Sequence, residues 1–304
     1  MNPQLLVDGL VAGSMIGLGA IGVTLTYSIL RFANFAHGEL IASGAYLTLV
    51  VAGALGAVIG SSAPLAPFSF TITLLVAAAL GMALTGILAL GLDAVLFAPL
   101  RRRGASIIII VMASFGASLA LRHAIEFAFT SSPAYFTREL QIALRFGPFR
   151  ATPDQIAMLV LTAVLVVAVH LMMTRSDAGR AMRAVAENPD LARVAGVDVD
   201  RVVRLTWLLG GALAGAAGTI AGLLVQIRPT MGFDLLLPLF AAAILGGIGS
   251  IPGAVLGGLV VGLCEAMAAQ TIGAQWRAGV GFAVIVAVLA LRPNGLFGRA
   301  WGRA

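Results

Sequence analysis

Long runs of apolar residues, separated by short polar segments, dominate the sequence. A helix needs about 20 residues to cross the ~30 Å hydrocarbon core of a bilayer, and most of the runs reach that length. They cover residues 5–30, 40–59, 70–97, 106–129, 155–173 and 205–227, with a last run at 280–291 that can begin earlier. The pattern predicts an all-α, polytopic integral membrane protein with about 7–9 transmembrane helices, forming a single domain over residues 1–304.

A further apolar stretch, Leu235–Ala269, is interrupted by the glycine-rich sequence between Gly246 and Gly258. Glycine and proline at this density rule out one stiff helix. We expect two shorter helices joined by a loop, whose backbone must lie against protein or a water-filled cavity. Nine crossings follow if both halves span the bilayer, and seven plus a re-entrant hairpin follow if they do not. The sequence leaves both open.

The longest charged segment, Arg175–Arg204, lies between two apolar runs and holds 11 of the 32 charged residues of the chain. Its charges recur at helical spacing, and the pair Asn188-Pro189 interrupts them. This regularity favours a structured helical loop outside the bilayer over a plain solvated connector. All 19 basic residues are arginine, and 13 of them lie at Arg31, at 101–103, in this segment or from Arg292 onward. Since cytoplasmic loops carry the positive excess, we expect an outside N-terminus and a cytoplasmic C-terminus.

The composition agrees with a membrane protein and excludes several other classes. The chain is 60% hydrophobic and 11% charged, with a mean hydropathy of +1.03, whereas soluble domains carry about 25% charged residues. The net charge of +6 is explained by arginines at span ends, so we expect no nucleic-acid partner. The single cysteine, Cys264, and three scattered histidines predict no metal site. The first apolar run follows no basic residue, which favours a retained span over a cleaved signal.

Three stretches, 34–47, 183–202 and 242–263, carry a resemblance that extends over essentially the whole chain. In them the chain resembles the membrane permease of bacterial ABC importers for branched-chain amino acids. The resemblance implies a short coupling helix at about Ala181–Gly196 that docks on an ATPase subunit. The residues it assigns to this coupling are Arg183, Glu187, Asn188, Pro189, Leu191 and Gly196.

The resemblance also implies the partners and the mechanism. The partners are a second, related permease subunit, two ATPase subunits and a periplasmic substrate-binding protein, all at the bacterial inner membrane. The chain itself would bind no cofactor and hold no catalytic residue, because ATP and Mg²⁺ are used by the ATPase subunits. Transport would proceed by alternating access. The expected ligand is a branched-chain or other hydrophobic amino acid, although similar permeases carry urea, short amides or other amino acids.

Elementary physics is consistent with the coupling helix. A short helix that projects from the bilayer can bury its apolar side in a partner protein and surround that contact with ion pairs. The apolar side predicted here consists of Ala184, Val185, Leu191 and Val194.

Two other segments are candidates for the translocation path. Asn34, His37 and Glu39 form a polar joint that we place in a loop at the interface, with a joint facing the path or the ATPase as the alternative. Charges inside lipid cost ~2.5–3.5 kcal/mol each, which favours the interface. The glycine-rich break either packs tightly near the pore or exposes backbone to the path. The residues of the break in question are Gly246, Gly247, Gly249 and Pro252. The break lacks the Lys and Ser/Thr of a phosphate-binding loop, so we expect no bound nucleotide.

Isolated charges within the spans suggest local contacts. Arg122 and Glu126 are four residues apart and can pair on one helix face. Asp93 and Glu265 are candidates for buried polar contacts. Two rival functions remain: a secondary transporter or channel that works alone, and an intramembrane enzyme. A secondary transporter would need an ion-coupling acid or base in the middle of a span. An intramembrane enzyme would need a nucleophile with its base or a metal site. The sequence favours neither.

Overall fold

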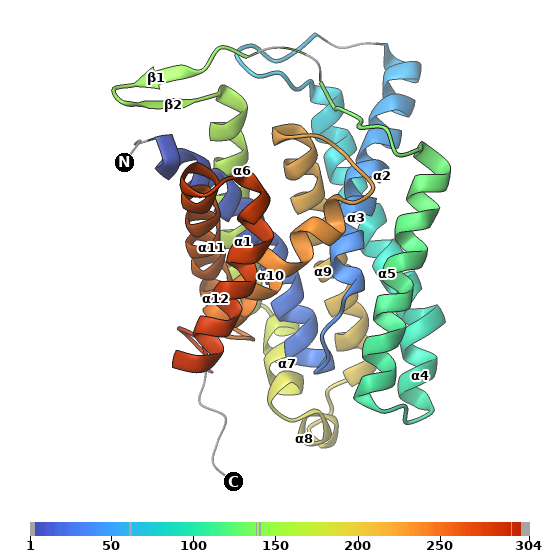
Figure 1. Cartoon of the computed structure of the whole chain (residues 1–304). Helices are drawn as coiled ribbons and strands as arrows, with labels where there is room; N and C mark the ends of the chain where they lie inside the picture. Colours follow the sequence, from blue (N-terminus) through green and yellow to red (C-terminus); the bar gives the residue numbers. More distant parts are fainter. Residues whose placement is uncertain (1–3, 61–62, 138, 140, 293, 299–304) are drawn as a thin grey trace.

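The computed structural model describes residues 4–60, 63–137, 139, 141–292 and 294–298, which fold into a bundle of helices (Figure 1). Within these residues eight helices are long and apolar enough to cross a membrane. They are α1 (Gln4–Leu30), α2 (Ala36–Ile59), α3 (Ile72–Leu92), α5 (Ile107–Phe129), α6 (Pro153–Arg175), α9 (Val199–Leu224), α11 (Ile251–Thr271) and α12 (Arg277–Leu291). Helix α3 continues through a π-helical stretch, Asp93–Phe97, into α4 (Ala98–Arg102), and the 3₁₀ turn Ala274–Trp276 leads into α12. The all-α polytopic fold is therefore confirmed.

The glycine-rich break separates two helices, as predicted. Helix α10 (Met231–Gly246) ends at the break, and α11 begins at Ile251. The break itself is only four residues long, and the later glycines lie inside α11. Helix α11 is long enough to cross the bilayer, whereas the 16 residues of α10 extend only ~24 Å. Of the two predicted helices, therefore, α11 can span the hydrocarbon core and α10 is shorter than the core.

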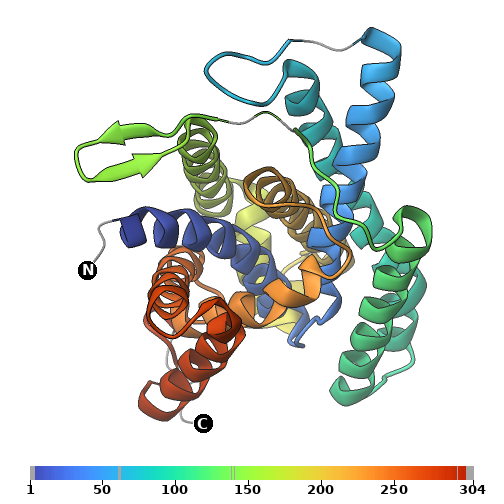
Figure 2. The same cartoon turned by 45° about the horizontal axis from the view of Figure 1, so that its top comes forward.

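Helices α1 and α9 lie at the centre of the bundle, which Figure 2 shows from nearer the top. Glycines on both helices allow their neighbours to approach closely. A Cβ placed on Gly13 of α1 would lie 2.7 Å from the Cα of Leu259 on α11. On α9, a Cβ on Gly215 would lie 2.8 Å from the hydroxyl oxygen of Thr85 on α3. Side chains larger than hydrogen are excluded from both positions.

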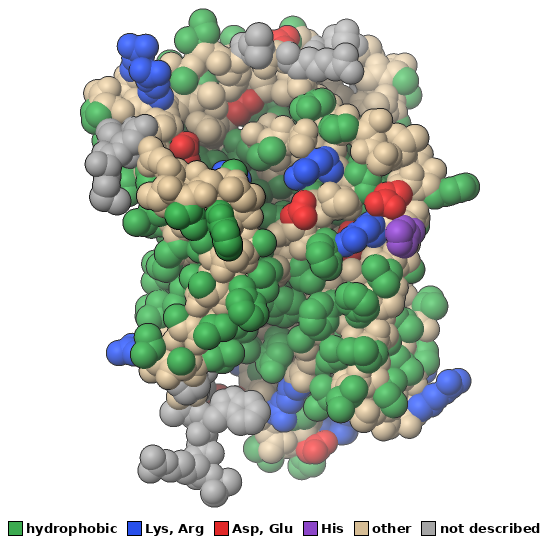
Figure 3. Space-filling view, in the orientation of Figure 1, with side chains coloured by type: hydrophobic (Ala, Val, Ile, Leu, Met, Phe, Trp, Pro, Cys, Tyr) green, Lys and Arg blue, Asp and Glu red, His purple; other side chains and the backbone are tan. Residues whose placement is uncertain are grey.

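The segment between the apolar runs 106–129 and 155–173 contains a short antiparallel hairpin, which the pattern of apolar residues did not predict. Strands β1 (Leu144–Phe146) and β2 (Phe149–Ala151) are joined at Gly147, whose φ of +62° suits glycine. The hairpin lies at the end of the bundle opposite to the short helices labelled α7 and α8 (Figure 1). Hydrophobic side chains cover much of the surface between these ends in Figure 3, consistent with a lipid-facing belt.

Candidate functional site

The charged segment 175–204 folds into two helices, α7 (Asp177–Glu187) and α8 (Pro189–Val194), between α6 and α9. The prediction of one coupling helix over Ala181–Gly196 is wrong, because Asn188 ends α7 and caps α8. Its side-chain oxygen accepts hydrogen bonds from the backbone N–H groups of Asp190 and Leu191, each at 3.0 Å. Pro189 then occupies the first turn, where a missing N–H costs nothing.

Gly196 closes α8 in a left-handed turn. Its φ is +86°, and its N–H donates to the carbonyl of Arg193 at 3.1 Å. The N–H of Val197 donates to the carbonyl of Ala192 at 2.9 Å. This pair of bonds satisfies carbonyls at the end of the helix and requires a residue that tolerates positive φ. Gly196 therefore fixes the direction in which the chain leaves α8.

The predicted apolar face is divided between the two helices. On α7, Val185 is 2% exposed and packs with Met182 into the core of the chain, so it is not available to a partner. Ala184 is half-buried against the same core. On α8, Leu191 and Val194 are 66% and 86% exposed. Of the four predicted apolar residues, only Leu191 and Val194 of α8 face outward, and those of α7 pack against the core. Arg183 and Glu187 are exposed on α7.

Arg31 connects this helical module to the first two long helices. One guanidinium nitrogen donates to the carbonyls of Ala186 and Glu187 at 3.3 and 3.1 Å. These carbonyls lie at the C-terminal end of α7, where a cation is favourable. Arg31 itself has a φ of +58°, a conformation that few residues other than glycine adopt. Sequence analysis missed this contact, since Arg31 and Ala186 are 155 positions apart.

The polar joint after Arg31 is shorter and more deeply placed than predicted. Residues 31–35 return into the bundle, and α2 already begins at Ala36. His37 and Glu39 are 0% and 1% exposed, so their placement in an interfacial loop is wrong. Asn34 is also buried, and its side-chain oxygen accepts a hydrogen bond from the N–H of Ala36 at 3.1 Å. All three residues lie inside the bundle, in or just before the first turn of α2.

His37 lies against the central helix α1. A Cβ on Gly22 would be 2.6 Å from the Cε1 atom of the imidazole, so glycine makes room for the ring. Neither ring nitrogen has a hydrogen-bond partner of ordinary geometry among the described residues, although the Gly19 carbonyl interacts with the ring. Buried polar atoms without partners are uncommon in folded proteins.

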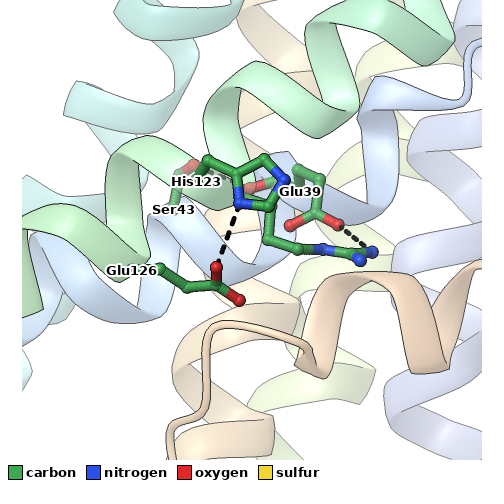
Figure 4. A network of polar contacts seen from close by, with 5 residues as sticks. Glu39, Ser43, His123 and Glu126 are labelled. Carbon is green, nitrogen blue, oxygen red and sulfur yellow. Dashed lines mark hydrogen bonds and ion pairs between the residues drawn. The ribbon is translucent and has the colours of Figure 1, made fainter. Parts of the chain in front are cut away.

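Glu39 pairs with Arg122 of α5, at 3.2 Å between carboxylate and guanidinium (Figure 4). The predicted pair of Arg122 with Glu126 is not formed; Glu126 lies 3.1 Å from the ring nitrogen of His123 instead. The guanidinium of Arg122 also lies over the ring of Phe233, 4.5 Å from its centroid. The close-up shows charged side chains of α2 and α5 meeting, and the Phe233 ring adds a contact from α10.

The glycine-rich break is tightly packed. Gly247 and Gly249 both have φ of +92°, which only glycine adopts readily, and Pro252 lies in the first turn of α11. A Cβ on Gly246 would lie 2.6 Å from the backbone nitrogen of Ala254. Close to this break, a cavity of about 320 Å³ lies between α1, α10 and the end of α12. Its lining is mostly apolar and includes Val23, Thr24, Tyr27, Phe240, Ile248 and Leu289.

The other two charged residues predicted to make buried contacts, Asp93 and Glu265, lie within helical segments. Asp93 is 4% exposed and forms a two-bond ion pair with Arg101, at 2.7 and 3.1 Å, which confirms the predicted buried contact. Glu265 is half-buried on α11, and one of its oxygens lacks a hydrogen-bond partner among the described residues. Across the described part of the chain, no group of three His, Cys, Asp or Glu residues is arranged to hold a metal ion.

The described chain is thus a multi-pass helical membrane domain with a projecting pair of short helices and a buried polar segment. The chain belongs to the family described as the branched-chain amino acid transport system / permease component, whose model matches residues 5–289.

Several named proteins are similar to it over nearly their whole length. The high-affinity branched-chain amino acid transport system permease protein BraD of Pseudomonas aeruginosa is 34% identical, covering 97% of this chain and 95% of that protein. LivH of Escherichia coli, of the same description, is 32% identical over the same shares. A probable LivH of Methanocaldococcus jannaschii is 27% identical, covering 99% and 94%. Permeases for fructose and autoinducer 2 match less than half of the chain.

Proposed function

We propose that this chain is a permease subunit of an ATP-driven importer and provides the path for branched-chain amino acids. Sequence similarity supports the substrate and the class, through the relatives named for branched-chain amino acid transport and the family model over residues 5–289. The single structural observation that carries the ATP-driven part is α8, which presents Leu191 and Val194 to the outside on a helix supported by the core.

The mechanism that we propose assigns the energy source to other subunits. An ATPase subunit would contact α8, and its closure on ATP would move the α7–α8 module. Arg31 would pass that displacement to residues 31–35, because it binds the last carbonyls of α7. Those residues lead into the buried start of α2, so a shift there changes the packing around His37 and Glu39. Alternating access would follow from this movement.

The full assembly is part of the same proposal. It would contain a second, related permease subunit, two ATPase subunits and a substrate-binding protein, in the inner membrane of a bacterium. The end of the bundle with α7 and α8 would face the cytoplasm, in agreement with the positive-inside rule. The N-terminus would then begin on the outer side and α12 would end on the cytoplasmic side. This requires nine crossings, with α10 and the residues before it as the ninth.

Co-purification tests the docking of α8 directly. The variant Leu191→Arg/Val194→Arg places two charges on the exposed apolar surface and leaves the buried side of α7 unchanged. We expect it to lose its ATPase subunit during purification, because an apolar interface core does not tolerate unpaired charge. Leu144→Arg, at an exposed leucine of the hairpin at the other end, is the matched control. Equal retention of the ATPase by both variants would refute docking through α8.

A further inference from the structure

Charged side chains from three helices meet on one face of the bundle. Glu39 of α2 pairs with Arg122 of α5, and next to them Asp234 of α10 lies 3.5 Å from Arg228. The ring of Phe233 joins the two pairs, since it lies under the guanidinium of Arg122. The negative charge of Asp234 also acts on Glu39. We call these four charged residues, Glu39, Arg122, Arg228 and Asp234, the charged face.

The charged face lies at the depth of the hydrocarbon core. Arg122 is 15 residues after the start of α5 and seven before its end, or ~22 Å and ~10 Å along the helix. Helix α10 begins at the same level, because a Cβ on Gly232 would lie only 3.0 Å from the Cα of Glu39. Helices as long as α5 span the ~30 Å core, so both ion pairs lie inside it.

The outer pair of this face cannot lie in lipid. The side chains of Asp234 and Arg228 are 53% and 44% exposed, whereas Glu39 is buried and Arg122 nearly so. Charged side chains at this depth occur almost only where they face a water-filled cavity or protein. The charged patch is visible among hydrophobic side chains on the right of Figure 3. An aqueous path next to α10 therefore explains the exposure of the outer pair.

Unused hydrogen-bonding capacity points to a ligand. Within the described residues, Glu39 Oε2, Arg122 Nε and Arg228 Nε are buried atoms without a hydrogen-bond partner. A carboxylate oxygen accepts from an ammonium group, and a guanidinium donates to a carboxylate in a planar fork. The face thus offers acceptors and donors side by side, which matches a molecule that carries both an ammonium and a carboxylate.

We infer that the charged face binds the α-ammonium and α-carboxylate groups of an amino acid during its passage. The inner pair, Glu39 and Arg122, is fixed by burial and by Phe233. The outer pair, Arg228 and Asp234, is long and solvent-accessible, so it opens at little cost. A zwitterion that enters between them leaves each charge with an opposite partner, which avoids an isolated charge at membrane depth. This inference rests on the proposed function and adds the residues that contact the head group.

Cysteine labelling in the assembled transporter tests this inference. The chain has one cysteine, so Cys264→Ser gives a cysteine-free parent. In that background Asp234→Cys places a thiol on the charged face. Ala120→Cys is the matched control: it is exposed on α5 two positions before Arg122, on the other side of the helix. Both variants are treated with a charged, membrane-impermeant methanethiosulfonate in proteoliposomes, with and without leucine.

We expect Asp234→Cys to react at least about tenfold faster than Ala120→Cys, because the charged reagent does not enter lipid. We also expect leucine, but not a neutral sugar, to slow the reaction at position 234. Equal, slow labelling of both positions would show that the face lies in lipid or under another subunit and would overturn the inference. Fast labelling without protection by leucine would overturn it as well. If Asp234→Cys does not fold, Arg228→Cys takes its place. Leucine uptake by the cysteine-free parent is measured in parallel, so that failure of the transport function itself is recognised separately.

Discussion

In the proposed mechanism, Arg31 transmits the movement of α7 and α8 to the buried start of α2. Its two hydrogen bonds to α7 join elements far apart in the sequence. The residues after it lead directly to Asn34, His37 and Glu39, all of which are buried.

For Arg31→Gln we expect ATP hydrolysis by the assembled transporter to continue while leucine transported per ATP falls about tenfold. A charge-assisted hydrogen bond contributes ~1.5–3 kcal/mol, and tenfold corresponds to about 1.4 kcal/mol. Paired measurements of phosphate release and leucine uptake provide the ratio. Arg102→Gln, at an exposed arginine of α4, should leave the ratio unchanged. An unchanged ratio in Arg31→Gln would refute the role of this contact.

Asp93 and Arg101 give a residue-scale prediction about stability. Arg101→Ala leaves a carboxylate with 4% exposure without its two-bond partner, so we expect a loss of about 3 kcal/mol. The neighbouring variant Arg102→Ala removes the same side chain from an exposed position and should have almost no effect. Thermal unfolding in detergent compares the two; a similar midpoint for both would contradict the importance of the pair.

At the residue scale, the sequence predicts which charged residues are buried better than it predicts which residues they pair with. The burial of Asp93 follows from its place in an apolar run. The pairing of Arg122 does not, because Glu39 lies 83 positions away and Glu126 only four. A helical spacing indicates which residues can meet on one helix, but it carries no information on which helix lies opposite.

At the scale of elements, the close contact of α1 with α11 depends on glycines without room for a side chain. Gly13→Ala would place a methyl group 2.7 Å from the Cα of Leu259, so we expect a destabilisation of ~1–3 kcal/mol. Gly116→Ala on α5 is the control, because no atom lies within 4 Å of its added Cβ, and alanine favours helix over glycine. Thermal unfolding should therefore separate the two substitutions. Equal melting temperatures would indicate that α1 and α11 can move apart without cost.

Gly196 provides a second prediction about elements. Its φ of +86° suits glycine, so Gly196→Ala should strain the end of α8 by about 1 kcal/mol. Because nothing lies within 4 Å of an added Cβ, the effect should be local and should leave the thermal midpoint of the bundle nearly unchanged. Hydrogen exchange of residues 189–197 measures it: faster exchange is expected there, and exchange equal to the parent would contradict the role of the turn.

The pattern of apolar and polar positions predicts the long helices closely and the short ones poorly. Apolar runs of about 20 residues leave little choice of structure in a bilayer. Within the charged segment, however, Asn188 serves both as the end of α7 and as the cap of α8, and the burial of Val185 depends on tertiary packing. The early start of α2 was missed for a related reason: polar residues at 34–39 suggest water, whereas here other helices surround them.

At the scale of the whole molecule, the bundle has two different ends. One end carries the hairpin of β1 and β2 (Figure 1). The other end carries α7 and α8 and faces the cytoplasm in our proposal. Between them, the ion pairs Glu39–Arg122 and Arg228–Asp234 lie together on one face, beside α2, α5 and α10. A path for a polar head group therefore requires only one face of the chain, which is consistent with a second permease subunit completing it.

The central claim is that this chain moves its substrate only when another subunit hydrolyses ATP. Proteoliposomes that contain the chain with its second permease, its ATPase subunits and its binding protein should accumulate radiolabelled leucine when ATP is present at the ATPase side. Proteoliposomes with the permease subunits alone, or with the full assembly and a non-hydrolysable ATP analogue, should show no accumulation. Uptake of leucine by the permease subunits alone would contradict the account.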